Sequence, residues 1–194
     1  NSILIAVLSV IGVIVFATLI AYALSYYDFR GKKLVELLML VGLVIPFEII
    51  IIPLYYNYKF VGILGGRASV YITQIALNIP ISVFILKGFI SDIPTSLVEA
   101  ARIDGASEWN VLQRIIAPII VPAEVSVIIL IFMWTWNDFM LGNIMLKSES
   151  VRTLPLGLSY FQGKFSRDIP LTSAASVIIM APVLLVYSIF QKQM

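Results

Sequence analysis

The sequence predicts an all-α membrane protein, a polytopic bundle of helices with a long polar loop. Hydrophobic residues make up 60% of the 194 residues and charged residues only 12%, and the mean hydropathy is +1.01. Soluble domains carry about twice that share of charge, which keeps their surface solvated. The apolar residues also gather in stretches of the ~20 residues that a helix needs to cross a bilayer. Much of the surface is therefore expected to face lipid.

Five stretches are long and apolar enough to cross the membrane. We predict spans at residues 2–27, 34–58, 69–90, 115–141 and 170–191. Each must be helical, because hydrocarbon offers no water to satisfy the backbone polar groups. The length fits a single transmembrane domain over residues 1–194. Because the chain starts at Asn1 inside an apolar stretch and stops just after another, we interpret it as a piece of a longer chain.

The first two spans carry marks of their own. Three tyrosines end the first span, which is typical of the aromatic belt at a membrane interface. In the second span, Pro46 and Pro53 flank Glu48. Each proline removes a helix hydrogen bond, so we expect this span to be kinked or broken there.

Two connections between the spans are charged. Residues 28–33 contain Arg30, Lys32 and Lys33, and residues 91–114 form a longer polar loop. An excess of Lys and Arg in short loops marks the cytoplasmic side, so residues 28–33 are expected there. Residues 91–114 follow two spans later and are therefore expected on the same side. The basic cluster is also suited to binding anionic lipid, which is a second interpretation of the same residues.

The composition excludes several kinds of function. Without Cys or His, the chain lacks a disulfide, a Cys-based metal or redox site and the commonest general base. We therefore expect neither a metal site nor catalytic residues. The net charge of +2 gives no reason to expect a nucleic-acid partner. No G-x-x-x-x-G-K-[ST] motif is present, so the chain is not expected to bind and hydrolyse ATP itself.

The loop at 91–114 predicts two short helices joined by a turn. Ser96 and Glu99 have the spacing of a capping box. Gly105 follows where a positive φ would end the first helix, and Ser107 is placed to cap the second. A short helix with small residues and a charged rim is suited to docking in a groove of another protein. The alternative is an ordinary amphipathic connector.

The same loop resembles the cytoplasmic loop of bacterial ABC-importer permeases. That loop reads Glu-Ala-Ala, three residues, Gly, nine residues, Ile and then Leu-Pro. Here Glu99, Ala100, Ala101, Gly105, Ile115 and Pro118 occupy these places, and Ala117 departs from the usual Leu. Across nearly the whole chain, segments such as DFRGKK, WNDF and TLPLGL look like carbohydrate-importer permeases of the maltose type.

The resemblance implies a coupling mechanism and a set of partners. The helix with Glu99, Ala100, Ala101, Asp104 and Gly105 would contact a cytoplasmic ATPase dimer that binds ATP and Mg²⁺. The further partners would be a second permease subunit, identical or homologous, an extracytoplasmic sugar-binding protein and the lipid of a bacterial or archaeal inner membrane.

Polar residues inside the spans are the candidates for the substrate path. Glu48 is expected to line the path or to bond the backbone groups that the prolines free. Gln74 and Asn78 share a helix face and suit either sugar hydroxyls or helix packing.

A second group of candidates lies near the end of the fourth span. Trp134, Asn137 and Asp138 suit either a sugar path, with Trp134 and Asp138 on one face, or an interface anchor. Glu124, near the other end of that span, is expected to snorkel or to contact another subunit.

Three other functions compete with sugar import. The same importer class could carry an amino acid, a phosphate ester or a peptide. A passive channel or structural membrane subunit would need no docking helix. A membrane enzyme is disfavoured, because the carboxylates are scattered along the chain.

Overall fold

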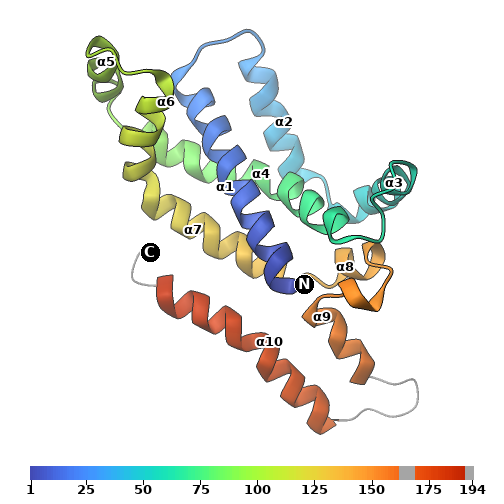
Figure 1. Cartoon of the computed structure of the whole chain (residues 1–194). Helices are drawn as coiled ribbons and strands as arrows, with labels where there is room; N and C mark the ends of the chain where they lie inside the picture. Colours follow the sequence, from blue (N-terminus) through green and yellow to red (C-terminus); the bar gives the residue numbers. More distant parts are fainter. Residues whose placement is uncertain (162–168, 191–194) are drawn as a thin grey trace.

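A computed structural model of the protein describes residues 1–161 and 169–190 (Figure 1). The described residues are helical with connecting turns and contain no β-strand, only an isolated bridge between Gly65 and Leu146. Four described helices are long and apolar enough to cross a membrane, and a bent pair makes a fifth span if it counts as one. The predicted all-α, polytopic fold class is confirmed.

The long helices and the bent pair make up most of the molecule. The long helices are α1 (Ser2–Tyr26), α4 (Arg67–Ser91), α7 (Ala117–Trp136) and α10 (Ile169–Phe190), and the bent pair is α2 (Lys32–Val44) and α3 (Phe47–Phe60). The shorter elements are α5 (Thr95–Ile103), α6 (Glu108–Val111), the π-helix η1 (Leu112–Ile116), α8 (Met140–Met145), η2 (Glu149–Val151), α9 (Leu154–Gly157) and η3 (Leu158–Phe161).

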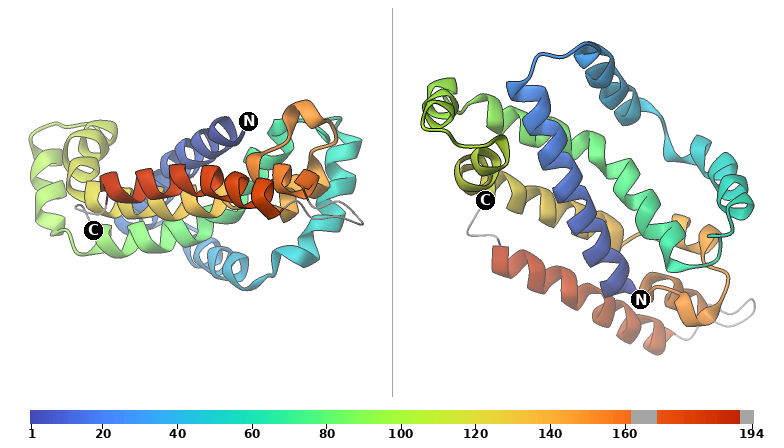
Figure 2. Two further views of the ribbon diagram at one scale, coloured as in Figure 1. Left: turned by 90° about the horizontal axis from the view of Figure 1, so that it is seen from below. Right: turned by 45° about the horizontal axis from the view of Figure 1, so that its top comes forward.

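Helices α1, α4 and α7 pack together and hold the main core. Figure 1 shows α1 crossing in front of α4 and α7, and Figure 2 gives two further views of this arrangement. Small residues such as Ala17, Ala21 and Ala123 are fully buried, which lets the helix backbones approach closely. At Gly12 a Cβ atom would lie 2.4 Å from Cδ1 of Ile75, so only glycine fits there without a shift.

The second predicted span is broken, as the prolines indicated. Helix α2 ends at Val44, and α3 starts at Phe47 with its axis turned by 103°. Ile45 is extended, which is the conformation that a following proline imposes on its neighbour. Pro53 lies inside α3 without ending it. The break therefore occurs at Pro46.

The fourth span begins and ends earlier than the predicted 115–141. The helical run extends from Glu108 to Trp136 through α6, η1 and α7. Ser107 starts the run by accepting a hydrogen bond from the Asn110 backbone, at 3.4 Å. Asn137 is the C-cap residue, and its side chain donates to the carbonyl of Met133 at 2.8 Å. Asparagine competes for backbone groups in this way and so favours helix ends.

Helix α10 lies beside α7 (Figure 1). The indole of Trp136 on α7 donates to the carbonyl of Ile179 on α10 at 3.0 Å. Pro182 lies one turn further along α10, and a proline frees backbone carbonyls that neighbouring helices can satisfy. Residue 191, the predicted end of this span, lies outside the described residues.

The two ends of the bundle are built from different segments. The loops at 28–33 and 91–114 lie at the same end, where Arg102 contacts the ring of Tyr27, in keeping with one membrane face. At the other end, the side chain of Asn1 donates to the carbonyls of Ser150 and Arg152, at 2.8 and 2.9 Å. The hydroxyl of Ser2 accepts from the Leu154 backbone at 2.7 Å.

Candidate functional site

The loop between α4 and α7 forms a helix–turn–helix at the edge of the bundle. Helix α5 ends in a Schellman motif, in which Ala106 N–H donates to Ala101 at 2.9 Å and Gly105 N–H donates to Arg102 at 3.0 Å. Gly105 has φ +82°, as its position predicted, because L side chains rarely adopt this conformation. A sharp turn therefore separates α5 from α6.

The predicted capping box at the start of α5 is wrong. Pro94 is the N-cap residue and the helix begins at Thr95, so Ser96 and Glu99 lie inside it. No side chain caps this helix end. Because proline fixes its own φ, the chain turns into the helix two residues earlier than the Ser-x-x-Glu spacing indicated.

Helix α5 is attached to the bundle along one side only. Val98 is 1% exposed and belongs to the main core, and Ala101 packs against that core while half-buried. The other resemblance-derived coupling residues, Glu99, Ala100, Asp104 and Gly105, are all exposed. We call the outward face formed by Glu99, Ala100, Ile103 and Asp104 the α5 face.

The α5 face is apolar at its centre. Ile103 is 85% exposed, and Ala100 lies one turn before it, with the carboxylates of Glu99 and Asp104 beside them. Nearby, Trp109 of α6 is 57% exposed. An exposed apolar area with a polar rim is typical of a surface that binds another protein.

A polar cluster behind α5 was not predicted. Glu108 accepts from Nε and Nη2 of Arg102, at 2.8 and 3.1 Å, and from the hydroxyl of Tyr22, at 2.7 Å. The Arg102 guanidinium lies 5.9 Å from the centre of the Tyr27 ring. The hydrogen-bonded Glu108 carboxylate raises the pKa of Arg102 above its ordinary value. Arg102 and Glu108 flank the glycine turn in sequence, which was the available signal for their pairing.

Tyr22 also corrects the aromatic belt predicted at the end of α1. Its side chain is only 5% exposed, and its ring packs against Tyr26 and Tyr27 with centroids 5.3 and 6.0 Å apart. Tyr27, in contrast, is 37% exposed. Only part of the tyrosine cluster is therefore available to a membrane interface.

Glu48 lies beside the break of the bent pair α2–α3. It is exposed in the first turn of α3, just after the break at Pro46. A carboxylate in the first turn is favoured by the helix dipole. Glu48 therefore lies at a helix start, in the second half of the bent pair.

Gln74 and Asn78 bond to each other inside the bundle. Both are buried, and Nδ2 of Asn78 donates to the backbone carbonyl of Gln74 at 2.7 Å and to its side-chain oxygen at 3.1 Å. The shared helix face predicted for them is thus observed. Both bonds lie within α4, so a role in the substrate path or in packing against a neighbouring helix stays a prediction.

Trp134, Asn137 and Asp138 are separated by the end of α7. Trp134 is 49% exposed on the last turn, and Asn137 is exposed at the cap. Asp138 accepts from the backbones of Leu141 and Gly142, at 3.3 and 2.9 Å, at the start of α8. The predicted common face of Trp134 and Asp138 is wrong, because the helix ends between them.

Glu124 has a partner within the chain. It accepts a hydrogen bond from the hydroxyl of Thr18 on α1 at 2.9 Å. A polar link between two spans is a usual way to satisfy a carboxylate at membrane depth. The link pairs Glu124 within this chain, where we had expected snorkelling or a contact with another subunit.

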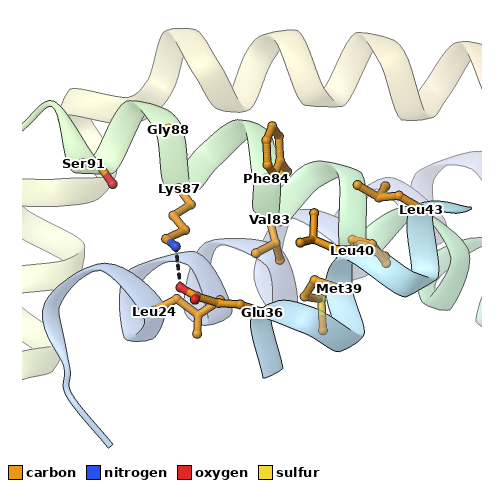
Figure 3. A pocket seen from close by; sticks show the side chains of 11 residues that line it. Leu24, Glu36, Met39, Leu40, Leu43, Val83, Phe84, Lys87, Gly88 and Ser91 are labelled. Carbon is orange, nitrogen blue, oxygen red and sulfur yellow. Dashed lines mark hydrogen bonds and ion pairs between the residues drawn. The ribbon is translucent and has the colours of Figure 1, made fainter. Parts of the chain in front are cut away.

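A pocket of about 340 Å³ lies between α2 and α4 (Figure 3). Its wall is apolar except at one end, where Lys87 of α4 points toward Glu36 of α2 and forms an ion pair with it. None of the predicted substrate-path residues lines it. Opposite charges inside two predicted spans were the sequence signal for this pair, which we missed. No group of acidic residues in the described part of the chain is able to hold a metal ion.

Known proteins resemble the chain over its whole length. AraQ, the arabinooligosaccharides transport system permease protein of Halalkalibacterium halodurans, is 31% identical over 99% of this chain and 68% of its own length. MalG, the trehalose/maltose transport system permease protein of Thermococcus litoralis, is 36% identical over 99% of this chain and 69% of its own. The chain thus spans roughly two thirds of these relatives.

Solved structures share the fold. A bacterial ABC transporter involved in the import of the acidic polysaccharide alginate contains a chain that superposes with a TM-score of 0.85 and 23% identity, over 99% of this chain and 72% of its own. A chain of the MetNI methionine ABC transporter gives 0.73 at 17% identity, over 98% of this chain and 90% of its own. The family model described as the inner membrane component of binding-protein-dependent transport systems matches residues 3–194. The chain is therefore a member of the binding-protein-dependent transport system inner membrane component family.

Proposed function

We propose that the protein is a permease subunit of an ABC importer for a sugar or oligosaccharide, and that α5 couples it to a separate ATPase. It would work with a second permease subunit, identical or homologous, and with a binding protein that delivers the cargo outside. AraQ and MalG are named for arabinooligosaccharides and for trehalose and maltose, which supports a carbohydrate cargo. ATP and Mg²⁺ would be bound by the ATPase.

The α5 face is the observation on which the coupling role depends. It projects Ile103, at 85% exposure, and Ala100 beyond the end of the bundle. An ATPase biases a membrane equilibrium only through contacts that differ between the two states. A short helix that is anchored by Val98 and open on its other side provides such a contact.

The coupling role is tested by retention of the ATPase. Ala100→Trp in the full-length subunit places a large ring on the α5 face, and the ATPase that co-purifies with the wild-type subunit in detergent should be lost. The matched control is Asn57→Trp, an exposed helical position on α3, at the opposite end. ATPase retained by Ala100→Trp, with full transport, would contradict coupling through α5. Transport that continues although no ATPase co-purifies with the wild-type subunit would instead favour a passive channel or structural subunit.

The cargo class is tested separately with the reconstituted importer and its binding protein. Oligosaccharides should stimulate ATP hydrolysis, and amino acids, phosphate esters and short peptides should not. Stimulation by one of these other classes would leave the importer role intact and replace the carbohydrate cargo.

A further inference from the structure

The polar cluster behind α5 joins segments that are far apart in the chain. Tyr22 and Tyr27 come from the end of α1, Arg102 comes from α5, and Glu108 starts α6. We call these four residues the Glu108 cluster. Glu108 is its centre, because it accepts the hydrogen bonds of both Arg102 and Tyr22.

The geometry of the cluster is that of a strong contact. Nε of Arg102 bonds one carboxylate oxygen of Glu108 and Nη2 bonds the other, which is the bidentate fork. A plain pair at this exposure, 36% for Arg102 and 43% for Glu108, contributes little. Here the carboxylate also accepts a hydrogen bond from the hydroxyl of Tyr22, a residue that is 5% exposed and part of the core. The pair is thereby held to a rigid part of the bundle.

The chain leaves α5 on both sides through breaks in regular helix. On one side the chain passes through the turn at Gly105, and on the other through Pro94. After α6 the helix continues as the π segment η1, where the regular hydrogen-bond ladder is interrupted. Single-turn π segments are frequent at functional sites. Regular α-helix therefore does not join α5 directly to the spans, which makes a second contact important for carrying a movement of α5.

We propose that Glu108 is a positioning residue that makes α5, the start of the α6–α7 run and the end of α1 move as one body. This inference depends on the proposed coupling role of α5. Pulled by the ATPase, α5 would draw on α1 through the bonds from Arg102 to Glu108 and from Tyr22 to Glu108. Helix α1 packs along both α4 and α7, so its displacement would reach the whole core.

The test uses the intact importer in proteoliposomes and measures cargo molecules transported per ATP hydrolysed. Glu108→Gln weakens the fork with Arg102 but keeps the size of the side chain. The ATPase should stay bound and active, while the transport ratio falls by about fivefold or more, the lower end of ordinary coupling between sites. The matched control is Glu149→Gln, an exposed carboxylate at the other end of the bundle, which should keep the wild-type ratio.

Two further variants test the inference if the importer with Glu108→Gln does not assemble. Tyr22→Phe removes one hydroxyl and leaves the ion pair, and it should lower the ratio without releasing the ATPase. The double exchange of Arg102→Glu with Glu108→Arg restores an ion pair and should recover part of the ratio that Glu108→Gln loses. No recovery counts against the inference.

The two proposals fail in different ways. A wild-type transport ratio in Tyr22→Phe and in every Glu108 variant that assembles would overturn the positioning role. If Ala100→Trp still released the ATPase in that case, the coupling role of α5 would stand. Retention of the ATPase and full transport in Ala100→Trp would instead remove the coupling role, and the positioning role with it.

Discussion

The core helices α1, α4 and α7 differ sharply from α10 and the α2–α3 pair. Within the best membrane-spanning windows, 33% of α1, 50% of α4 and 39% of the run ending in α7 are buried, against 6% of α10. Helix α2 buries no residue and α3 only Ile51. In lipid an exposed apolar face carries no penalty, so burial within the chain shows which helices pack on one another and which face lipid or other subunits.

The largest expected contrast comes from one substitution made in both regions. Leu86→Ala on α4 opens a cavity at a residue with 0% exposure and should lower the free energy of unfolding by about 2–5 kcal/mol. Leu185→Ala on α10, at 63% exposure, should change it by less than about 0.5 kcal/mol. Thermal unfolding of the full-length subunit in detergent measures both. Equal shifts would remove the distinction between the regions.

The next largest effect is expected when the hydrogen bond between the two regions is removed. Trp136→Phe keeps the stacking on Phe132, whose ring centroid is 5.5 Å away, but removes the donor to Ile179. The free energy of unfolding should fall by about 1–2 kcal/mol, because the buried carbonyl of Ile179 loses its hydrogen-bond donor. Helix α10 should then be cut faster in limited proteolysis. Trp134→Phe, at an exposed position, is the control and should leave the cleavage rate unchanged.

A smaller effect is expected inside the core. Thr18→Val removes the hydroxyl that donates a hydrogen bond to Glu124. The free energy of unfolding should fall by about 0.6 kcal/mol, the average for hydrogen bonds between spans. Thr18→Ser retains the hydroxyl and serves as the comparison. A melting temperature in Thr18→Val equal to that of the serine variant would show that the bond stabilises nothing.

The smallest effect is expected outside both regions, in the loop after α1. Asp28 pairs with Lys32 at 3.2 Å, but its side chain is fully exposed. Water screens such a pair almost completely. Asp28→Asn should therefore leave the melting temperature of the subunit unchanged, and a clear drop would mean that this loop contributes to the packing of α2.

Local signals predicted the breaks in the chain better than the contacts across it. Pro46 and Gly105 each impose a backbone conformation on their own neighbourhood, so the bend and the sharp turn could be expected from single residues. Ser96 failed as a cap because Pro94 competed for the same helix start. The end of α7 was missed because a single aspartate in an apolar stretch does not by itself mark a helix end. The role of Asp138 becomes clear only once α8 is known to follow.

The Glu108 cluster could not be found along the chain. Tyr22 and Glu108 are 86 residues apart, and only the packing of α1 on the α6–α7 run brings them together. Glu36 and Lys87 pose the same problem, since they lie in different predicted spans and are 51 residues apart. A sequence shows that such charges need partners, and the fold decides which partners they have.

The bonds from Asn1 and Ser2 to the segment at 150–154 give α1 a second attachment, far from the Glu108 cluster. Helix α1 is thus bonded near both ends, and sliding it along its own axis would break the hydrogen bonds at one of them. If α5 moves as proposed, the bonds around Asn1 hold one end of α1 while the end at Tyr22 follows α5. Small shifts of α5 would then produce the greatest displacement near Tyr22 and almost none near Ser2.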